Sequence, residues 1–194
     1  MRLAAWFAIA LVLAGCAAVP RPPKGVDWTA RRTALQAMSE WRMTGRVAVA
    51  AGADGASGSL DWHEAGGVSE LRISGPFGAG AMRVTLGPQG LRLEDADGAR
   101  VEGAQAERLL ADRLGTDVPL ASLRHWVLGA PAPGLPFTET AGGNGVPPAF
   151  EQAGWRVSVD RWHLVAGRLL PARLTAELAG ARLKLAVSRW DFAP

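Results

Sequence analysis

Most of this chain alternates apolar and polar side chains with a period of two. Such segments bury one face and leave the other in water, which is typical of strands in an antiparallel sheet. The apolar positions of these segments are Val47 and Val49, Leu60 and Trp62, Leu71 and Ile73, Met82, Val84 and Leu86, Leu91 and Leu93, Trp155, Val157 and Val159, Leu174, Ala176 and Leu178, and Leu183, Leu185 and Val187. Asp97-Gly98 is a strong hairpin turn signal between such segments. The pattern predicts eight or more antiparallel strands.

Three stretches follow a helical period instead. Residues 27–41 place Trp28, Leu35, Met38 and Trp41 near one face, with Asp27 as an N-cap. Residues 104–114 end before a glycine suited to a helix stop, and residues 119–128 begin with a proline suited to a first helical turn. A loop rich in Gly and Pro is expected from residue 130 to about residue 149. These elements predict a mainly β (α+β) chain, built as a strongly curved antiparallel sheet or an open barrel with short helices at its mouth. The alternation is compatible with a filled interior and with a hollow one.

The N-terminus carries an export and anchoring signal. Met1-Arg2 is followed by an apolar run and then by Leu13-Ala14-Gly15-Cys16. This is the layout of a secretory signal peptide, and the last four residues resemble the lipobox of bacterial lipoproteins. The resemblance implies cleavage before Cys16 and acylation of that residue. A plain signal peptide with an incidental cysteine and a transmembrane anchor are the alternatives, but the apolar run is shorter than the about 20 residues that span a bilayer.

The rest of the chain then divides into a tether and one domain. Residues 1–15 are predicted to be removed, and residues 16–26 form a lipidated cysteine and a Pro-rich, semi-rigid tether. Residues 27–194 have the length of a single domain. Ala17 follows the anchor; in enterobacterial lipoproteins an aspartate there retains the protein in the inner membrane. Alanine therefore implies export to the periplasmic face of the outer membrane.

Charge and composition exclude several classes of function. The 21 Lys and Arg nearly balance the 18 Asp and Glu, for a formal net charge of +3, so no nucleic-acid footprint is present. Cys16 is the one cysteine, which leaves no disulfide. The three histidines show no metal-ligand spacing, and neither a nucleotide loop nor a G-x-S-x-G serine occurs. We expect no catalytic site, no metal and no cofactor.

Two aromatic features leave alternatives open. The chain has eight tryptophans and no tyrosine; rings such as Trp62, Trp126 and Trp155 could form ordinary core or line a cavity for an apolar ligand. In Gly75-Pro76-Phe77-Gly78, an aromatic side chain stands between turn-forming residues that join two strands. Phe77 is either tucked under the sheet or displayed at the loop tip.

Several short motifs in a fixed order resemble the LolB family of outer-membrane lipoprotein receptors. They cover residues from about 41 to 190, most of the mature domain. They are Trp41-x-x-Thr44-Gly45-Arg46-x-Ala48-Val49, Gly75-Pro76-Phe77-Gly78, Leu114-Gly115 with Val118-Pro119-Leu120, Leu123-Arg124-x-Trp126-Val127-Leu128-Gly129-x-Pro131, Leu170-Pro171-x-Arg173-Leu174, and Arg182-Leu183-Lys184-Leu185 before Trp190.

The resemblance implies an incomplete antiparallel barrel whose helices close a hydrophobic cavity for acyl chains. The residues expected to line it are Trp62, Ile73, Met82, Val84, Trp126 and Trp155. The resemblance further implies that the protein accepts acylated lipoproteins from the periplasmic carrier LolA and inserts them into the outer membrane without nucleotide. In the family a hydrophobic residue at the tip of the Gly75–Gly78 loop protrudes and is needed to place lipoproteins in the membrane; here it is Phe77, where the best-known members carry leucine.

Two other functions stay open at this point. One is a lipoprotein that carries another amphiphile, such as a glycolipid, and the other is a structural or assembly lipoprotein with a filled barrel. Nothing in the sequence argues against a monomer.

Overall fold

A single curved antiparallel sheet organises the chain. The computed structural model describes residues 27–75, 80–140, 147 and 149–192. Its eleven strands are ordered β6-β5-β4-β3-β2-β1-β11-β10-β9-β8-β7, so the sheet ends at β6 and β7 and does not close. The strands are β1 (Trp41–Ala51), β2 (Asp54–Ala65), β3 (Val68–Ser74), β4 (Met82–Gly87), β5 (Gly90–Asp95), β6 (Arg100–Glu102), β7 (Phe137–Glu139), β8 (Ala149–Gln152), β9 (Trp155–Val165), β10 (Arg168–Leu178) and β11 (Ala181–Asp191). The predicted mainly β, incomplete antiparallel barrel is confirmed.

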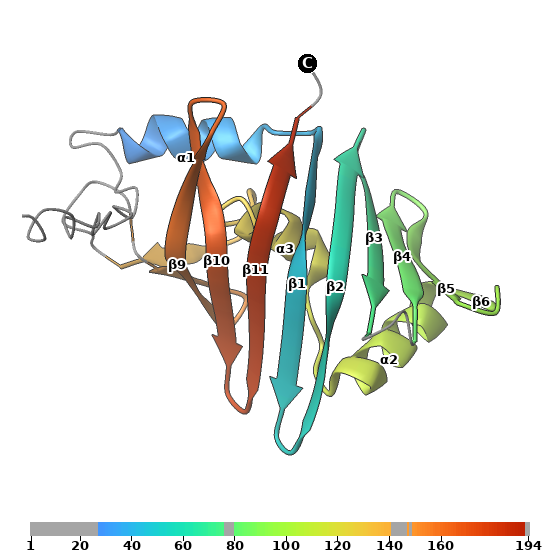
Figure 1. Ribbon diagram of the computed structural model, residues 1–194. Helices are drawn as coiled ribbons and strands as arrows, with labels where there is room; N and C mark the ends of the chain where they lie inside the picture. The colour runs from blue at the N-terminus through green and yellow to red at the C-terminus, as the bar shows by residue number, and fades with distance from the viewer. Residues whose placement is uncertain (1–26, 76–79, 141–146, 148, 193–194) are drawn as a thin grey trace, which may run out of the picture.

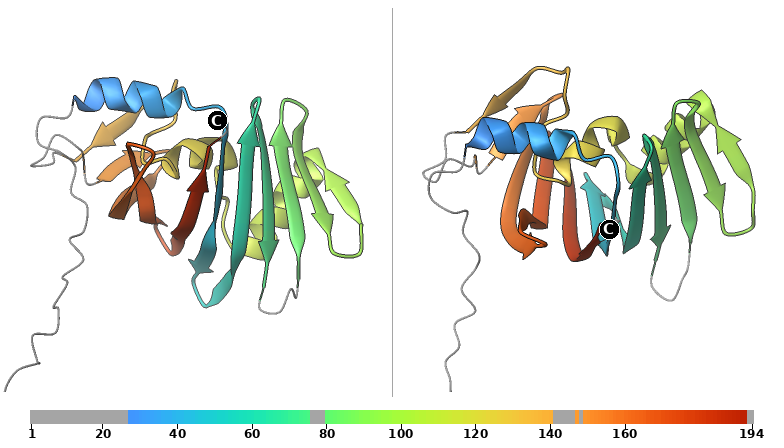
Figure 2. Two further views of the ribbon diagram at one scale, coloured as in Figure 1. Left: turned by 45° about the horizontal axis from the view of Figure 1, so that its top comes forward. Right: turned by 90° about the horizontal axis from the view of Figure 1, so that it is seen from above.

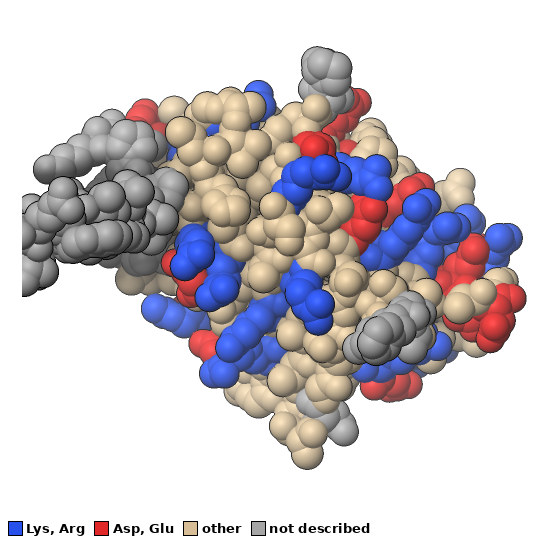
Figure 3. All heavy atoms as spheres, in the orientation of Figure 1, with Lys and Arg blue, Asp and Glu red and all other residues tan. Residues whose placement is uncertain are grey.

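The alternation of the sequence becomes an inner apolar face and an outer polar face. In β5 the inward Leu91 and Leu93 are buried, whereas Arg92 between them is exposed. Figure 3 looks onto the outer face, where Lys and Arg side chains lie among Asp and Glu. The strands therefore supply one continuous apolar surface on the inside of the curve.

Bulges bend the sheet. The register of β1 against β11 shifts between Thr44 and Gly45, and β10 is irregular against β9 around Pro171. A Cβ at Gly45 would collide with the carbonyl oxygen of Ala186, so this close approach requires glycine. Such bulges increase local twist and bending. Figure 2 shows the resulting curve, with helices α2 and α3 on its inner side.

Three helices accompany the sheet: α1 (Trp28–Gln36), α2 (Gly103–Leu114) and α3 (Leu120–Trp126). The predicted helices 104–114 and 119–128 are confirmed within a few residues. The predicted helix 27–41 is too long, because Trp41 already pairs with Glu64 as the first residue of β1. In the described part of the chain, every helix is too short or too polar to cross a bilayer.

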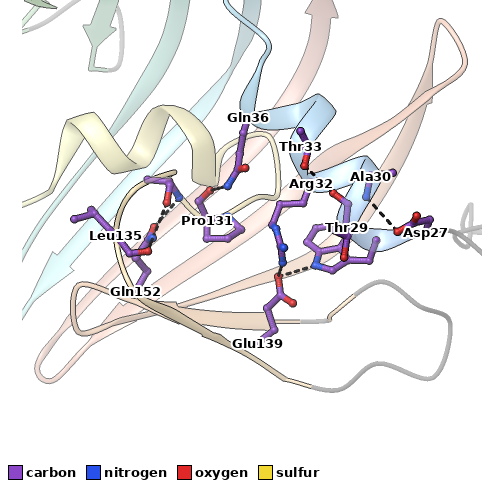
Figure 4. Close-up of polar contacts among 12 residues, drawn as sticks. Asp27, Thr29, Ala30, Arg32, Thr33, Gln36, Pro131, Leu135, Glu139 and Gln152 are labelled. Carbon is purple, nitrogen blue, oxygen red and sulfur yellow. Dashed lines mark hydrogen bonds and ion pairs between the residues drawn. The ribbon is translucent and has the colours of Figure 1, made fainter.

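Helix α1 lies across one end of the curve, beside β9 and β10 (Figure 1). Asp27 caps it by accepting a hydrogen bond from the backbone N–H of Ala30, as predicted. One carboxylate oxygen, Glu139 Oε1, accepts from Trp28 Nε1 at 2.6 Å and Arg32 Nη1 at 2.8 Å (Figure 4). The helix is thereby fixed to the short edge strand β7.

Candidate functional site

A partly open cavity of about 660 Å³ lies inside the curve, between β1–β5, β11 and the two inner helices. This volume is within the about 300–1,000 Å³ of typical small-molecule sites. The larger apolar side chains that line it are Val47, Val49, Leu60, Trp62, Leu71, Ile73, Met82, Val84, Leu110, Leu114, Val118, Leu120, Leu123, Val127, Leu183 and Leu185. The interior of the barrel is therefore hollow on this side.

Four of the six side chains expected in the cavity lie in its lining: Trp62, Ile73, Met82 and Val84. They lie together because they point to the same face of neighbouring strands: Trp62 pairs with Leu71, Leu71 with Val84, and Ile73 with Met82. That they contact an acyl chain stays a prediction. Of the other expected site residues, Gly75 is at the cavity edge, whereas Cys16, Pro76, Phe77 and Gly78 lie outside the described residues.

The structure places Trp126 and Trp155 elsewhere. Their ring centroids are 6.3 Å apart, and Trp126 also packs against Phe150 at 6.5 Å. Both rings are buried in the part of the core beneath β8–β10, and neither is among the described residues that line the cavity. Side chains fill this part of the interior.

One side chain, Gln152, satisfies several buried polar groups of that filled region. Gln152 Oε1 accepts from Trp126 Nε1 at 2.8 Å and from the backbone N–H of Ala132 at 2.7 Å. Gln152 Nε2 donates to the carbonyl oxygens of Ala132 and Leu135 (Figure 4). This network holds the segment after α3 against β8.

That residues of α2, α3 and β11 also line the cavity was not predicted from the sequence. Leu110 and Leu114 from α2, with Leu120 and Leu123 from α3, face the cavity from the side opposite the sheet. Their spacing of three or four residues was the available signal, since it marks one apolar face on each helix. That signal does not say which surface the face covers.

A tryptophan cluster closes one end of the cavity. The ring centroids of Trp41 and Trp62 are 5.3 Å apart, and those of Trp41 and Trp190 are 5.6 Å apart. Beside them the fully buried Glu64 accepts a hydrogen bond from the Ser69 hydroxyl and forms an ion pair with Arg124 Nη1 at 3.2 Å. This ion pair ties α3 to β2.

The other end of the cavity is its exposed rim. We call this the cavity mouth: Gly75, Gly80, Ala81, Asp95–Asp97 and Arg113, together with the start of β2. Gly80, Asp97 and Arg113 are exposed, whereas Trp62 is buried. From Gly58 near the mouth to Trp62, four residues of strand span about 13 Å. The cavity is thus polar at its mouth and apolar in its depth.

A second hollow, of about 490 Å³, lies at the ends of β1–β3, and most of its lining residues are charged: Glu40, Arg42, Asp61, Glu70, Arg72 and Asp191. Arg42 donates to Asp61 in a two-bond pair there, and this guanidinium is the first cause of a lowered pKa at Asp61. Charged walls do not suit an alkyl chain. We therefore place the binding site in the apolar cavity.

Among the described residues that line the cavity, titratable side chains occur only at its mouth. His125 on α3 is buried, and burial followed by the charge of Arg124 lowers its pKa to about 4. It is therefore neutral at physiological pH. In the described ranges, no group of three His, Cys, Asp or Glu side chains could hold a metal ion.

Comparison with known proteins agrees with this geometry. Residues 39–190 match the family model for "Outer membrane lipoprotein LolB". A protein named outer-membrane lipoprotein LolB from Halorhodospira halophila is 37% identical over 192 residues, covering 98% of this chain and 95% of the relative. Its counterpart from Pseudomonas fluorescens is 31% identical, covering 95% and 93%.

Solved structures show the same fold at low identity. A LolA superfamily protein from Nitrosomonas europaea superposes with a TM-score of 0.56 at 11% identity, covering 87% of this chain and 94% of that one. A DUF1329 family protein from Desulfovibrio piger also reaches 0.56, at 9% identity, covering 86% and 90%. On the strength of the family model and of these full-length relatives, this chain belongs to the LolB family of outer-membrane lipoproteins.

Proposed function

We propose that this protein is an outer-membrane receptor that accepts acylated lipoproteins and inserts them into the outer membrane. The observation that carries the proposal is the apolar, partly open cavity of about 660 Å³ in a chain of this family. A structural lipoprotein would have no use for a hollow interior. The filled-barrel alternative is therefore not favoured.

Transfer without nucleotide follows from the energetics of acyl chains. Each CH₂ group moved out of water contributes about 0.8 kcal/mol, so a long acyl chain left in water costs on the order of 10 kcal/mol. A receptor that binds the chain better than a carrier does, and less well than the bilayer does, makes transfer downhill at each step. A cavity that is half open suits such an intermediate affinity. The protein acts by binding and release and requires no catalytic group or cofactor.

The donor in this scheme is a soluble periplasmic carrier of the LolA kind. Support comes from the shared fold, since a solved protein named as a LolA superfamily member superposes over most of this chain. Two curved sheets of one architecture can present cavities to each other without any change of fold. We propose that the receptor acts as a monomer that contacts the carrier, the lipoprotein and the membrane lipids in turn.

The anchor of the receptor is its own acylated Cys16, at the end of the tether 16–26 and after removal of residues 1–15. Support comes from the lipobox-like sequence and from the position of α1, which begins at Trp28. The tether would hold residues 27–194 at the periplasmic face of the outer membrane. Anchoring raises the local concentration of receptor at the bilayer and is not needed for the binding step itself.

The loop Gly75–Gly78 is the proposed membrane-insertion device, with Phe77 as its apolar tip. Gly75, the first residue of the loop, and Gly80, which follows it, both belong to the cavity mouth. An apolar ring at that place would enter the interface of the bilayer beside the exit path of the acyl chains. Phenylalanine supplies the apolar surface that leucine supplies in other members of the family.

A transfer assay with a Phe77→Glu variant tests this proposal, with Phe77→Leu as the matched control. The mature chain carrying Cys16→Ala is given a radiolabelled lipoprotein bound to its carrier, and then liposomes. We expect Phe77→Glu to accept the lipoprotein normally and to deliver at least tenfold less of it to the liposomes, because a carboxylate does not enter the interface. Phe77→Leu should deliver as the wild type does. Normal delivery by Phe77→Glu would remove the insertion role, and a wild-type chain that accepts no lipoprotein would remove the receptor function.

A further inference from the structure

Charge is distributed unevenly around the cavity. Among the described residues that line it, those with a formal charge are Asp95, Asp97 and Arg113, and all three lie at the mouth. Trp62, Leu71 and Val84, deeper inside, are buried and apolar. An amphiphile whose chains occupy the depth must therefore place its polar linkage among these three side chains.

Most N–H donors of the Arg113 guanidinium have no hydrogen-bond partner among the described residues. It stands in the last turn of α2, and its Nη1 lies 3.3 Å from the thioether sulfur of Met82, which is a weak acceptor. Among the described residues, no carboxylate forms an ion pair with it. Arg83, Arg92 and Arg100 on the nearby outer face contrast with it, since each reaches Glu94 or Glu102.

The two aspartates differ in how they are used. The Asp95 side chain accepts hydrogen bonds from the backbone N–H groups of Asp97 at 3.0 Å and Ala99 at 2.9 Å, so it is occupied in holding the turn between β5 and β6. Asp97 is exposed at the tip of that turn. The mouth thus contains a guanidinium with unused donors and an exposed carboxylate that forms no ion pair among the described residues.

We infer that Arg113 and Asp97 form a polar filter that admits acyl chains joined through uncharged ester and amide groups and disfavours lipids that carry a phosphate. The inference deepens the proposed function and rests on it. Ester and amide carbonyl oxygens of an acylated cysteine accept hydrogen bonds from Arg113 and carry no charge for Asp97 to repel. A phosphodiester at the same depth meets Asp97 and Asp95 as well as Arg113, and like charges in one site are disfavoured. Such discrimination matters to a receptor beside a bilayer, where phospholipids far outnumber lipoproteins.

Three fluorescence-competition titrations on the mature chain with Cys16→Ala test the filter. The probes are a synthetic tripalmitoyl-cysteinyl peptide, phosphatidylglycerol with the same chains, and an alkyl-pyrene that has chains but no hydrogen-bond acceptor. Arg113→Met keeps the apolar stem and should weaken binding of the lipopeptide about tenfold while changing alkyl-pyrene binding less than twofold. Arg108→Met, on the same helix but outside the cavity lining, is the matched control and should change neither.

The Asp97→Asn variant tests the exclusion of phosphate. It should raise the affinity for phosphatidylglycerol about threefold at low salt and leave lipopeptide binding unchanged. Equal losses for lipopeptide and alkyl-pyrene in Arg113→Met, or no loss for either, would overturn the role of Arg113. An unchanged affinity for phosphatidylglycerol in Asp97→Asn would overturn the role of Asp97. A wild-type chain that binds none of the three probes would instead contradict the proposed function.

Discussion

The interior of the curved sheet has a hollow side and a filled side, and tryptophan side chains occur in both. On the hollow side, strands β1–β5 and helix α2 surround the cavity; on the filled side, strands β8–β10 and Trp126 of α3 close on one another. Both sides present tryptophans from the inner face. Trp62 borders empty space, whereas Trp126 lies between Trp155 and Phe150.

The hydrogen bonds of the indole groups repeat this difference. On the filled side, Trp126 Nε1 donates to Gln152 at 2.8 Å. In the cluster at the end of the cavity, only Trp190 has such a partner among the described residues, the carbonyl oxygen of Pro171 at 3.0 Å. The buried Nε1 atoms of Trp41 and Trp62 have no partner among the described residues. A buried unpaired donor is a cost to stability. The filled side is thus built for stability, and the hollow side forgoes part of that stability to keep room for a ligand.

The largest effect is expected from the polar network of the filled side. Gln152→Met keeps the side-chain volume but leaves Trp126 Nε1 and both backbone groups of Ala132 without their partner. We expect a loss of about 3 kcal/mol in the free energy of unfolding, measured in urea. Gln36→Met, which loses one partly buried bond to Pro131 O, is the control and should cost less than about 1 kcal/mol. Equal losses of unfolding free energy in the two variants would contradict the claim that the Gln152 network contributes more than a single hydrogen bond.

Added volume should separate the two sides next. Ala176 is fully buried on the inner face of β10, so Ala176→Phe overpacks the filled side and should cost about 2 to 3 kcal/mol. Val84→Phe projects into the cavity and should change stability by less than about 1 kcal/mol. The same Val84→Phe variant should lose lipopeptide binding, as followed by the competition titration. A Val84→Phe protein as unstable as Ala176→Phe would mean that the cavity is not free space.

Removing an indole should also have unequal consequences. Trp126→Phe deletes a satisfied donor and packed ring atoms, for an expected loss of about 2 kcal/mol. Trp62→Phe deletes an unpartnered donor beside a cavity, for an expected loss below about 1 kcal/mol. Thermal and urea unfolding of both variants give the comparison, and a reversed order would contradict it.

The smallest effect is a pH dependence centred on α3, which lies between the two sides. Because the folded state holds the pKa of His125 near 4, below its ordinary value of 6.5, the unfolded chain binds the proton first as pH falls. Stability is therefore present above pH 6.5 and declines towards pH 4, by about 1 kcal/mol between pH 7 and 5.5. His125→Leu should remove this part of the pH dependence. If the stability of His125→Leu depended on pH as the wild type does, other groups would be responsible for that dependence.

Most strands of the sheet could be predicted from the sequence, because the alternation of apolar and polar residues is a local pattern. Alternation at Leu91 and Leu93 or at Val157 and Val159 needs only neighbouring residues to be read. The edge strands β6 and β7 and the strand β8 beside β7 are three or four residues long and too short to display a period. Trp28, Leu35, Met38 and Trp41 continue a helical spacing past the point where pairing with β2 and β11 takes over, so the first helix was predicted five residues too long.

The cavity was only partly predictable, for a physical reason. Parity shows that Trp62 and Trp155 both point inward, but it does not show which part of the interior is filled. That depends on where α2 and α3 cross the curve and on the packing of Trp126 against Trp155 and Phe150. The charges at the mouth also come from separate elements, with Asp97 after β5 and Arg113 at the end of α2. No local pattern joins them.

Quenching of tryptophan fluorescence by a brominated acyl chain tests the central claim most directly. A triacylated lipopeptide with bromine on its acyl chains quenches only indoles that it touches, so wild type, Trp62→Phe and Trp126→Phe are compared at saturating lipopeptide. We predict that Trp62→Phe loses most of the quenching seen in the wild type, and that Trp126→Phe keeps it. Quenching that survives in Trp62→Phe and disappears in Trp126→Phe would place the acyl chains on the filled side and contradict the account.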